Sequence, residues 1–84
     1  SLAVELAPRR IRVNAVAAGP VSGTSIELHP GSGELLARSA ARTPAGRLVT
    51  AEEVADLVLL VLSPEAQGLC GQVLIADGGL SLVL

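Results

Sequence analysis

Residues 72–76 read Gln-Val-Leu-Ile-Ala and carry the strongest indication of the fold. Val73, Leu74 and Ile75 follow one another with no polar residue between them. A continuous apolar run of this kind is typical of a strand that is buried on both faces of a sheet. Asp77-Gly78-Gly79 comes directly afterwards and predicts a turn. We therefore expect an inner strand at residues 72–76.

A second strand is predicted near the start of the chain, at residues 11–16. The sequence there is Ile-Arg-Val-Asn-Ala-Val, which is short and rich in β-branched residues, with Ile11, Val13 and Ala15 on one face. The long segment between the two strands carries helices, which favours a parallel pair joined by a right-handed crossover. Because two strands do not make a stable sheet, we interpret the chain as a piece of a larger α/β sheet.

The crossover helix is predicted to start at Thr50. Thr50-Ala51-Glu52-Glu53 has the spacing in which a hydroxyl and a carboxylate bind each other's free backbone N–H groups. From Val54 to Leu62 the segment is polar only at Asp56, which predicts a helix with few positions facing solvent. Ser63-Pro64 is expected to end it.

Two further helices and a loop complete the predicted elements. Residues 2–7 indicate the end of a helix, which Pro8 stops, and residues 34–42 indicate a short helix. Residues 17–25 hold two glycines, one proline, two serines and one threonine. These residue types permit sharp turning and close backbone approach, so this loop is the segment we expect to touch a ligand.

Composition excludes several classes of function. The chain has 84 residues with 6 basic and 8 acidic side chains, a net charge of −2, and no aromatic residue. It therefore offers neither a basic surface nor stacking platforms for nucleic acid. The apolar run at residues 57–62 is far shorter than the roughly 18 to 20 residues that cross a bilayer, so we expect no membrane partner. The single Cys70 favours a reducing compartment, and we expect a cytoplasmic protein.

Five pieces of sequence occur in a fixed order along the chain. They are Leu-Ala-Val-Glu-Leu-Ala-Pro-Arg-Arg-Ile-Arg-Val-Asn-Ala-Val at 2–16, the small-residue loop at 17–25, Gly46-Arg47 before an acidic helix start, Gly71-Gln72, and Asp77-Gly78-Gly79. Together they resemble the C-terminal third of a short-chain dehydrogenase/reductase, over essentially the whole chain. His29-Pro30, residues 34–36 and 43–49, and the end at 77–82 look most like enoyl-acyl-carrier-protein reductase III, an NADPH-dependent enzyme of fatty-acid synthesis.

The resemblance implies a Rossmann-type, doubly wound parallel sheet of which residues 1–84 form the C-terminal part. It also implies a glycine-rich pyrophosphate turn, and a tyrosine and lysine that donate and relay a proton during hydride transfer. The chain contains neither tyrosine nor lysine. We therefore expect a fragment that is inactive without the N-terminal part of the same domain. The resemblance further implies a homotetramer.

The implied cofactor is NADPH or NADH, held by the loop after the first strand of this chain. Ala18-Gly19-Pro20-Val21 matches the family's Pro-Gly-x-Val beside the nicotinamide ring, with Val21 bonding the carboxamide. Gly23 stands where the family usually has a cofactor-binding threonine, and Thr24 is displaced by one residue. The implied cofactor-binding residues are thus Ala18, Gly19, Pro20, Val21, Gly23 and Thr24.

The implied substrate is an acyl thioester or another small carbonyl compound. Residues 25–41 correspond to the family's substrate-binding lid, and an apolar channel for an acyl chain is expected from Ile26, Leu28, Leu35 and Leu36.

Two alternatives remain open. One is a short-chain enzyme that acts on a ketone or alcohol, for example 3-oxoacyl-acyl-carrier-protein reductase. The other is a non-catalytic binding or assembly module, in which the glycine-rich loop is an ordinary connection. His29 and Cys70 receive no role, because neither is accompanied in the sequence by the partners that catalysis or metal binding needs.

Overall fold

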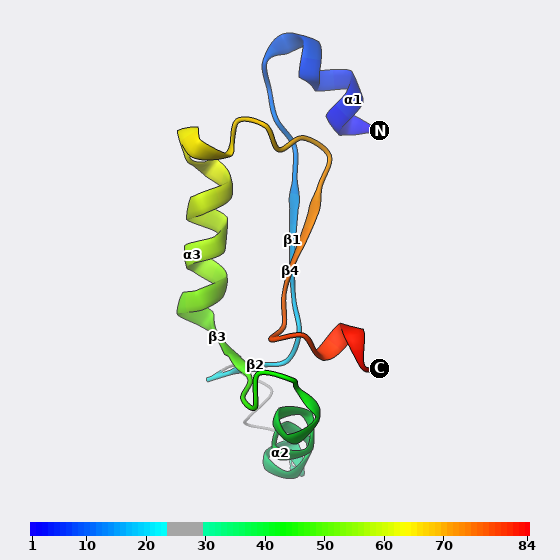
Figure 1. The fold of residues 1–84 in the computed structure, drawn as a ribbon, viewed down its shortest axis with the longest axis vertical. Coiled ribbons are helices and arrows are strands. Elements are labelled where there is room, and N and C mark those ends of the chain that lie inside the picture. The colour runs from blue at the N-terminus through cyan, green and yellow to red at the C-terminus, as the bar shows by residue number, and fades with distance from the viewer. Residues whose placement is uncertain (24–29) are drawn as a thin grey trace.

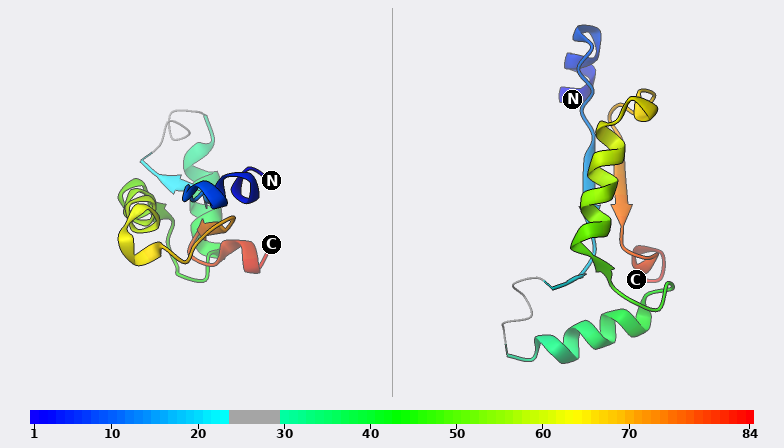
Figure 2. Two further views of the ribbon diagram at one scale, coloured as in Figure 1. Left: turned by 90° about the horizontal axis from the view of Figure 1, so that it is seen from above. Right: turned by 90° about the vertical axis from the view of Figure 1, so that its left-hand side faces the viewer.

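The computed structural model describes residues 1–23 and 30–84. Its elements in chain order are α1 (Leu2–Leu6), η1 (Ala7–Arg9), β1 (Ala15–Ala18), β2 (Val21–Ser22), α2 (Ser32–Arg42), β3 (Val49–Thr50), α3 (Ala51–Leu62), η3 (Pro64–Ala66), β4 (Val73–Ala76) and η4 (Leu80–Leu82). Strands β1 and β4 run side by side with α3 along them, and α1 lies at the amino-terminal end of the strands (Figure 1). Figure 2 shows α2 crossing beneath their carboxyl-terminal end. The chain is thus an α/β arrangement with its loops gathered at the two ends of one strand pair.

The parallel pairing of the two predicted strands is confirmed. Ala15 lies opposite Val73, and Ala18 lies opposite Ala76. The predicted position of the second strand is wrong by several residues, because the structure places it at Ala15–Ala18 rather than at 11–16. The Gly71 N–H donates to the Val13 carbonyl oxygen at 2.8 Å, but Gly71 has φ +72° and interrupts the extended backbone, so β4 starts only at Val73, which faces Ala15.

Helix α3 begins and ends where the sequence predicts. The Thr50 hydroxyl accepts a hydrogen bond of 3.1 Å from the Glu53 N–H, and the Glu53 carboxylate accepts one of 2.9 Å from the Thr50 N–H. Ser63 caps the other end, directly before Pro64. The expectation of few solvent-facing positions is not met in this chain, because Leu59 and Leu62 are exposed.

A second parallel pair was not anticipated. Strand β2 pairs with β3, with Val21 opposite Val49 and Ser22 opposite Thr50. Both strands are only two residues long, so local composition gives no signal for them. Their pairing links the loop after β1 directly to the start of α3.

The chain by itself leaves much apolar surface uncovered. Its radius of gyration is 15.5 Å, whereas a compact domain of this length has about 12 Å. Its accessible surface is 5850 Å², against about 4,600 Å² for a compact monomer of this mass. Helix α3 packs on one face of the strand pair, and on the other face Val73 and Ile75 are 64% and 57% exposed. On the side that faces α3, Leu74 and Ala76 are half-buried, so the strand expected to be buried on both faces is not fully buried on either face within the described residues.

The buried hydrophobic residues come from the helical segments and from β3, and none comes from the β1–β4 pair. They are Ala3, Leu36, Val49, Val61, Ala66 and Leu80. All are small or medium in size, which limits how much apolar area the core removes from water. Among the described residues, no helix has the length and apolar character needed to cross a membrane.

Candidate functional site

The carboxyl ends of β1 and β4 lie together and carry the glycine-rich segments. The Gly19 N–H donates a hydrogen bond of 3.4 Å to the carbonyl oxygen of Ala76, so the segments that follow β1 and β4 separate only after these residues. In open parallel α/β sheets, ligands bind outside this end of the strands. The edge formed by residues 18–22 and 77–79 is therefore the candidate site.

Gly19 allows the two strand ends to approach closely. A Cβ atom at this position would lie 2.9 Å from the Cβ of Asp77, closer than real Cβ contacts come. The close approach of Asp77, just after β4, therefore favours glycine at position 19. This reason is structural and does not depend on a ligand.

Asp77 organises the turn after β4. Its Oδ1 accepts a hydrogen bond of 2.9 Å from the Gly79 N–H, and its Oδ2 accepts one of 2.9 Å from the Ser81 N–H. Hydrogen bonds from Ser81, followed by the one from Gly79, hold the pKa of Asp77 below its ordinary value. The carboxylate therefore remains charged and holds the turn, and it is poorly suited to accept a proton from a substrate.

The same turn is packed against the end of α2. The Ala45 N–H donates a hydrogen bond of 3.1 Å to the Gly78 carbonyl oxygen. Gly78 has φ +65°, and a Cβ there would lie 2.8 Å from Cγ2 of Thr43. Thr43 is itself buried and donates its hydroxyl to the Ser39 carbonyl oxygen at 2.7 Å. These contacts fix the carboxyl end of α2 beside the strand ends.

The loop after β1 is held from the opposite side by β3. The Ser22 hydroxyl donates to the Val49 carbonyl oxygen at 3.5 Å, in addition to the strand pairing. Just before β3, the Arg47 guanidinium forms a two-pronged ion pair with Glu53, with N–O distances of 2.7 and 2.8 Å. Arg47, then the Thr50 N–H, lowers the pKa of Glu53 from 4.5 to about 2. One carboxylate thus connects the turn, β3 and the first turn of α3.

The structure places the predicted cofactor residues at this edge as far as it describes them. Ala18 ends β1, Gly19 and Pro20 follow it, Val21 begins β2, and Gly23 follows β2 in a turn with φ +76°. Thr24, Ile26 and Leu28 lie outside the described residues. The role assigned to each of these residues stays a prediction.

The two predicted substrate residues on α2 differ in their surroundings. Leu35 is 46% exposed, whereas Leu36 is 8% exposed and belongs to the core. An apolar side chain available to a ligand is therefore found at Leu35. The lining role predicted for both leucines remains untested.

Arg12 and Asn14 organise the other end of the strands, and the sequence reasoning missed them. Arg12 donates to the carbonyl oxygens of Val61 at 3.1 Å and Leu69 at 3.3 Å. Asn14 donates to Leu69 at 3.1 Å and accepts from the Gln72 N–H at 3.0 Å. The signal was present in the sequence, because two polar residues alternate with Ile11, Val13 and Ala15.

Within residues 1–23 and 30–84, no three side chains among His, Cys, Asp and Glu come together as a metal site. Glu53 at the start of α3 is accounted for by the capping box and by the Arg47 ion pair, and Glu52 lies in the first turn, where the helix dipole favours an acidic residue.

Comparisons with known proteins agree with this arrangement. Residues 1–81 match the family model described as "Enoyl-(Acyl carrier protein) reductase". The chain is 43% identical over 79 residues to the peroxisomal 2,4-dienoyl-CoA reductase of Pongo abelii, which covers 93% of this chain and 27% of that protein. It is 45% identical over 78 residues to the 3-oxoacyl-[acyl-carrier-protein] reductase of Thermotoga maritima, which covers 93% of this chain and 31% of that protein.

A solved structure shares the fold of the chain. It is a short chain dehydrogenase from Bacillus anthracis, with a TM-score of 0.79 and 38% identity over 95% of this chain and 31% of that one. The chain thus spans about 30% of the length of these relatives. The residues matched by the family model, 1–81, include the β1–β4 strand pair and helix α3.

Proposed function

The chain belongs to the short-chain dehydrogenase/reductase family, and we propose that it forms the nicotinamide-contact loop and the substrate lid of an NAD(P)-dependent oxidoreductase. The main support for the proposal is the position of residues 18–22. Residues 18–22 are fixed at the carboxyl edge of a parallel strand pair, between the Asp77 turn on one side and β3 on the other. Ligands of open α/β sheets bind at this edge.

The residues present are compatible with a nicotinamide ring. Ala18 is exposed at the strand end and Gly19 is half-buried, and neither residue has a side chain large enough to keep a flat ring away from the backbone. Hydride transfer is the chemistry that the nicotinamide supplies when bound. The contribution of this chain is to bind and orient that ring, with Val21 as the proposed contact to its carboxamide.

We propose that the proton is supplied by a tyrosine and a lysine outside this segment, since residues 1–84 contain neither. We place these groups in a preceding part of the same domain. The exposed apolar face at Val73 and Ile75 supports this placement, because helices on the second face of a larger parallel sheet would cover it. The exposed Leu59 and Leu62 of α3 fit a contact with a second subunit in a homo-oligomer.

The proposed substrate is an enoyl-acyl thioester of fatty-acid metabolism, and NADPH is the proposed reductant. The description of the matching family and the dienoyl-CoA reductase relative support this substrate class. A specific observation favours a second candidate, the reduction of a 3-oxoacyl thioester. The Thermotoga maritima relative has 45% identity and carries the name of that activity.

The test is a substrate comparison with the complete polypeptide that the reading frame encodes. NADPH oxidation is followed in the presence of an enoyl thioester and, separately, of the corresponding 3-oxoacyl thioester. Faster oxidation with the enoyl thioester is the expected result, and faster oxidation with the 3-oxoacyl thioester supports the second candidate. A folded polypeptide that binds neither NADPH nor NADH would contradict both.

Two glycine-to-alanine variants test whether cofactor binding depends on the loop after β1. Gly19→Ala introduces a Cβ at 2.9 Å from that of Asp77, whereas Gly33→Ala introduces one with no atom within 4 Å. Gly19→Ala should raise the KM for the cofactor, because the loop must shift to accommodate the methyl group. Gly33→Ala should leave it unchanged.

A further inference from the structure

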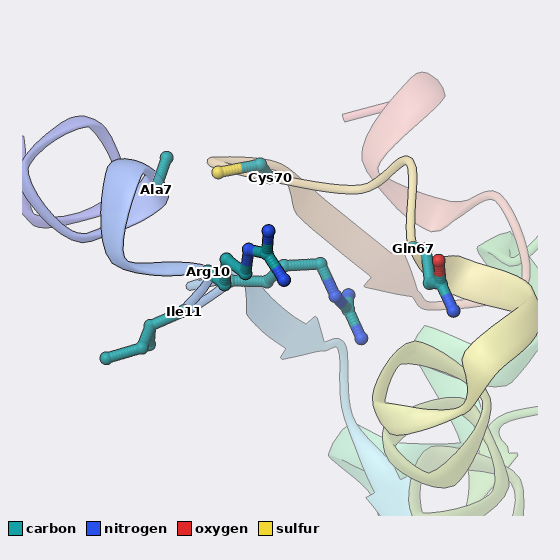
Figure 3. A pocket seen from close by; sticks show the side chains of 6 residues that line it. Ala7, Arg10, Ile11, Gln67 and Cys70 are labelled. Atoms are coloured by element: carbon teal, nitrogen blue, oxygen red, sulfur yellow. The ribbon is translucent and has the colours of Figure 1, made fainter.

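A pocket of about 430 Å³ lies at the end of the strands that is opposite to the candidate site. It is lined by Ala7, Arg10, Ile11, Arg12, Gln67 and Cys70. Figure 3 shows the Arg10 side chain in the middle, with Ala7 and Ile11 toward one side, Gln67 on the opposite side and Cys70 above Arg10. Pockets that bind small molecules measure about 300 to 1,000 Å³, so this one has a suitable size.

The pocket is positively charged although the whole chain is not. The chain has a net charge of −2, yet the lining contains two guanidinium groups and no carboxylate. Its amide donor is Gln67, and Ala7 and Ile11 add apolar surface. This combination of charge and donors favours an anion that carries a small apolar group.

The two arginines differ in how they are held. Arg12 uses two of its five N–H donors on the carbonyl oxygens of Val61 and Leu69, so its guanidinium is fixed and three donors remain. Arg10 makes no side-chain hydrogen bond or ion pair to any residue in the described part of the chain. One guanidinium is therefore pre-organised at the pocket, and the other is available to a ligand.

The backbone at Arg10 has an unusual conformation. Its φ of +62° lies in the left-handed region, and it is the only residue other than glycine with a positive φ among the described residues. This conformation costs about 1 to 2 kcal/mol for a residue with a Cβ. Glycine would adopt it without that cost, so the position favours glycine for stability and carries a charged side chain instead.

We propose that this pocket binds the phosphate group of a small phosphate or phosphomonoester. A carboxylate has two oxygens in one plane and is satisfied by one arginine, whereas a tetrahedral phosphate has oxygens for both arginines and for the Gln67 amide. The site is separate from the cofactor loop. Arg12 and Gly19 are seven residues apart along an extended segment, which corresponds to roughly 23 Å.

The experiment is a calorimetric titration of the complete encoded polypeptide with inorganic phosphate and, separately, with glycerol 3-phosphate. Saturable binding of at least one of them is expected. Tighter binding of glycerol 3-phosphate identifies a phosphomonoester as the ligand, and equal affinity identifies free phosphate. The absence of saturable binding for both would overturn the proposal.

Arg10→Gly is the decisive variant, because it removes one guanidinium and also relieves the left-handed backbone. The melting temperature should not fall, and the affinity should weaken by at least about tenfold. Arg9→Gln is the matched control, since it removes the same charge from a neighbour that does not line the pocket. Its affinity should change by less than about twofold. Equal weakening by both variants would show a non-specific charge effect and would contradict the site.

Discussion

Replacing Gly78 by alanine tests how the turn after β4 is held against the end of α2. The new Cβ would lie 2.8 Å from Cγ2 of Thr43 and 3.2 Å from the Cβ of Ala45. Thr43 cannot rotate away cheaply, because it is buried and its hydroxyl is bonded to the Ser39 carbonyl oxygen at 2.7 Å. The neighbours must therefore move, or the turn must open.

Two costs add in this variant. A residue with a Cβ in the left-handed region, here at φ +65°, loses about 1 to 2 kcal/mol. Overpacking of the kind expected at Thr43 and Ala45 costs about 1 to 3 kcal/mol more. The free energy of unfolding should thus fall by about 2 to 5 kcal/mol.

Gly46→Ala separates the two costs. Gly46 has φ +80°, but a Cβ there meets nothing within 4 Å, so only the backbone cost applies. Urea denaturation of the complete polypeptide, followed by circular dichroism, should place Gly78→Ala below Gly46→Ala by about 1 to 3 kcal/mol. Equal stability of the two variants would refute the packing of the Asp77 turn against α2.

Three other predictions concern stability. Glu53 has a pKa of about 2 in the folded chain against 4.5 ordinarily, so its contribution is complete above about pH 4.5 and is lost as the pH falls through about 2. Denaturation midpoints measured across that range should decline less steeply in Glu53→Gln than in the unmodified protein. Asn14→Ala removes both side-chain bonds to the segment before β4 and should lower the free energy of unfolding by about 1 to 3 kcal/mol in urea denaturation. Gly33→Ala, in the first turn of α2 with open space around it, should raise the melting temperature or leave it unchanged, since alanine stabilises a helix by up to about 1 kcal/mol. A melting temperature clearly below that of the unmodified protein would contradict the last expectation.

The elements predicted correctly are those with local causes. The capping box at Thr50 and the Ser63-Pro64 stop define α3, because each acts within one turn of the helix. The apolar run at 72–76 predicts a strand because three successive branched residues favour extended backbone, and the structure has β4 at Val73–Ala76. The parallel pairing followed from the length of the helical connection between the strands.

The features that were missed depend on residues far apart in the chain. Strand β1 starts at Ala15 because β4 is available only there, although the β-branched residues lie earlier. The β2–β3 pair joins residues 21–22 to 49–50, and nothing in either dipeptide predicts the other. Cys70 has no charged neighbour in the sequence, yet it shares a pocket with Arg10 and Arg12. Long-range placement of this kind requires the fold.

The sequence predicted a loop that contacts a ligand, and the structure gives the position of part of that loop. The glycines and small residues at 17–25 predicted a loop of close backbone approach, and the described part of it, after Ala18, lies at the carboxyl edge of the strand pair. The requirement for glycine at position 19 comes from Asp77, which lies 58 residues later in the chain and gives no local signal. The cofactor and substrate contacts remain predictions.

We propose above that residues 1–84 supply the cofactor loop of a short-chain oxidoreductase. The most direct measurement is a chimera in which these residues replace the matching segment of the Thermotoga maritima relative, with which they share 45% identity over 78 residues. We expect a folded chimera that binds NADPH and catalyses hydride transfer, whereas the relative truncated before this segment should do neither. A chimera that folds but shows no more NADPH binding than the truncated relative would contradict the claim.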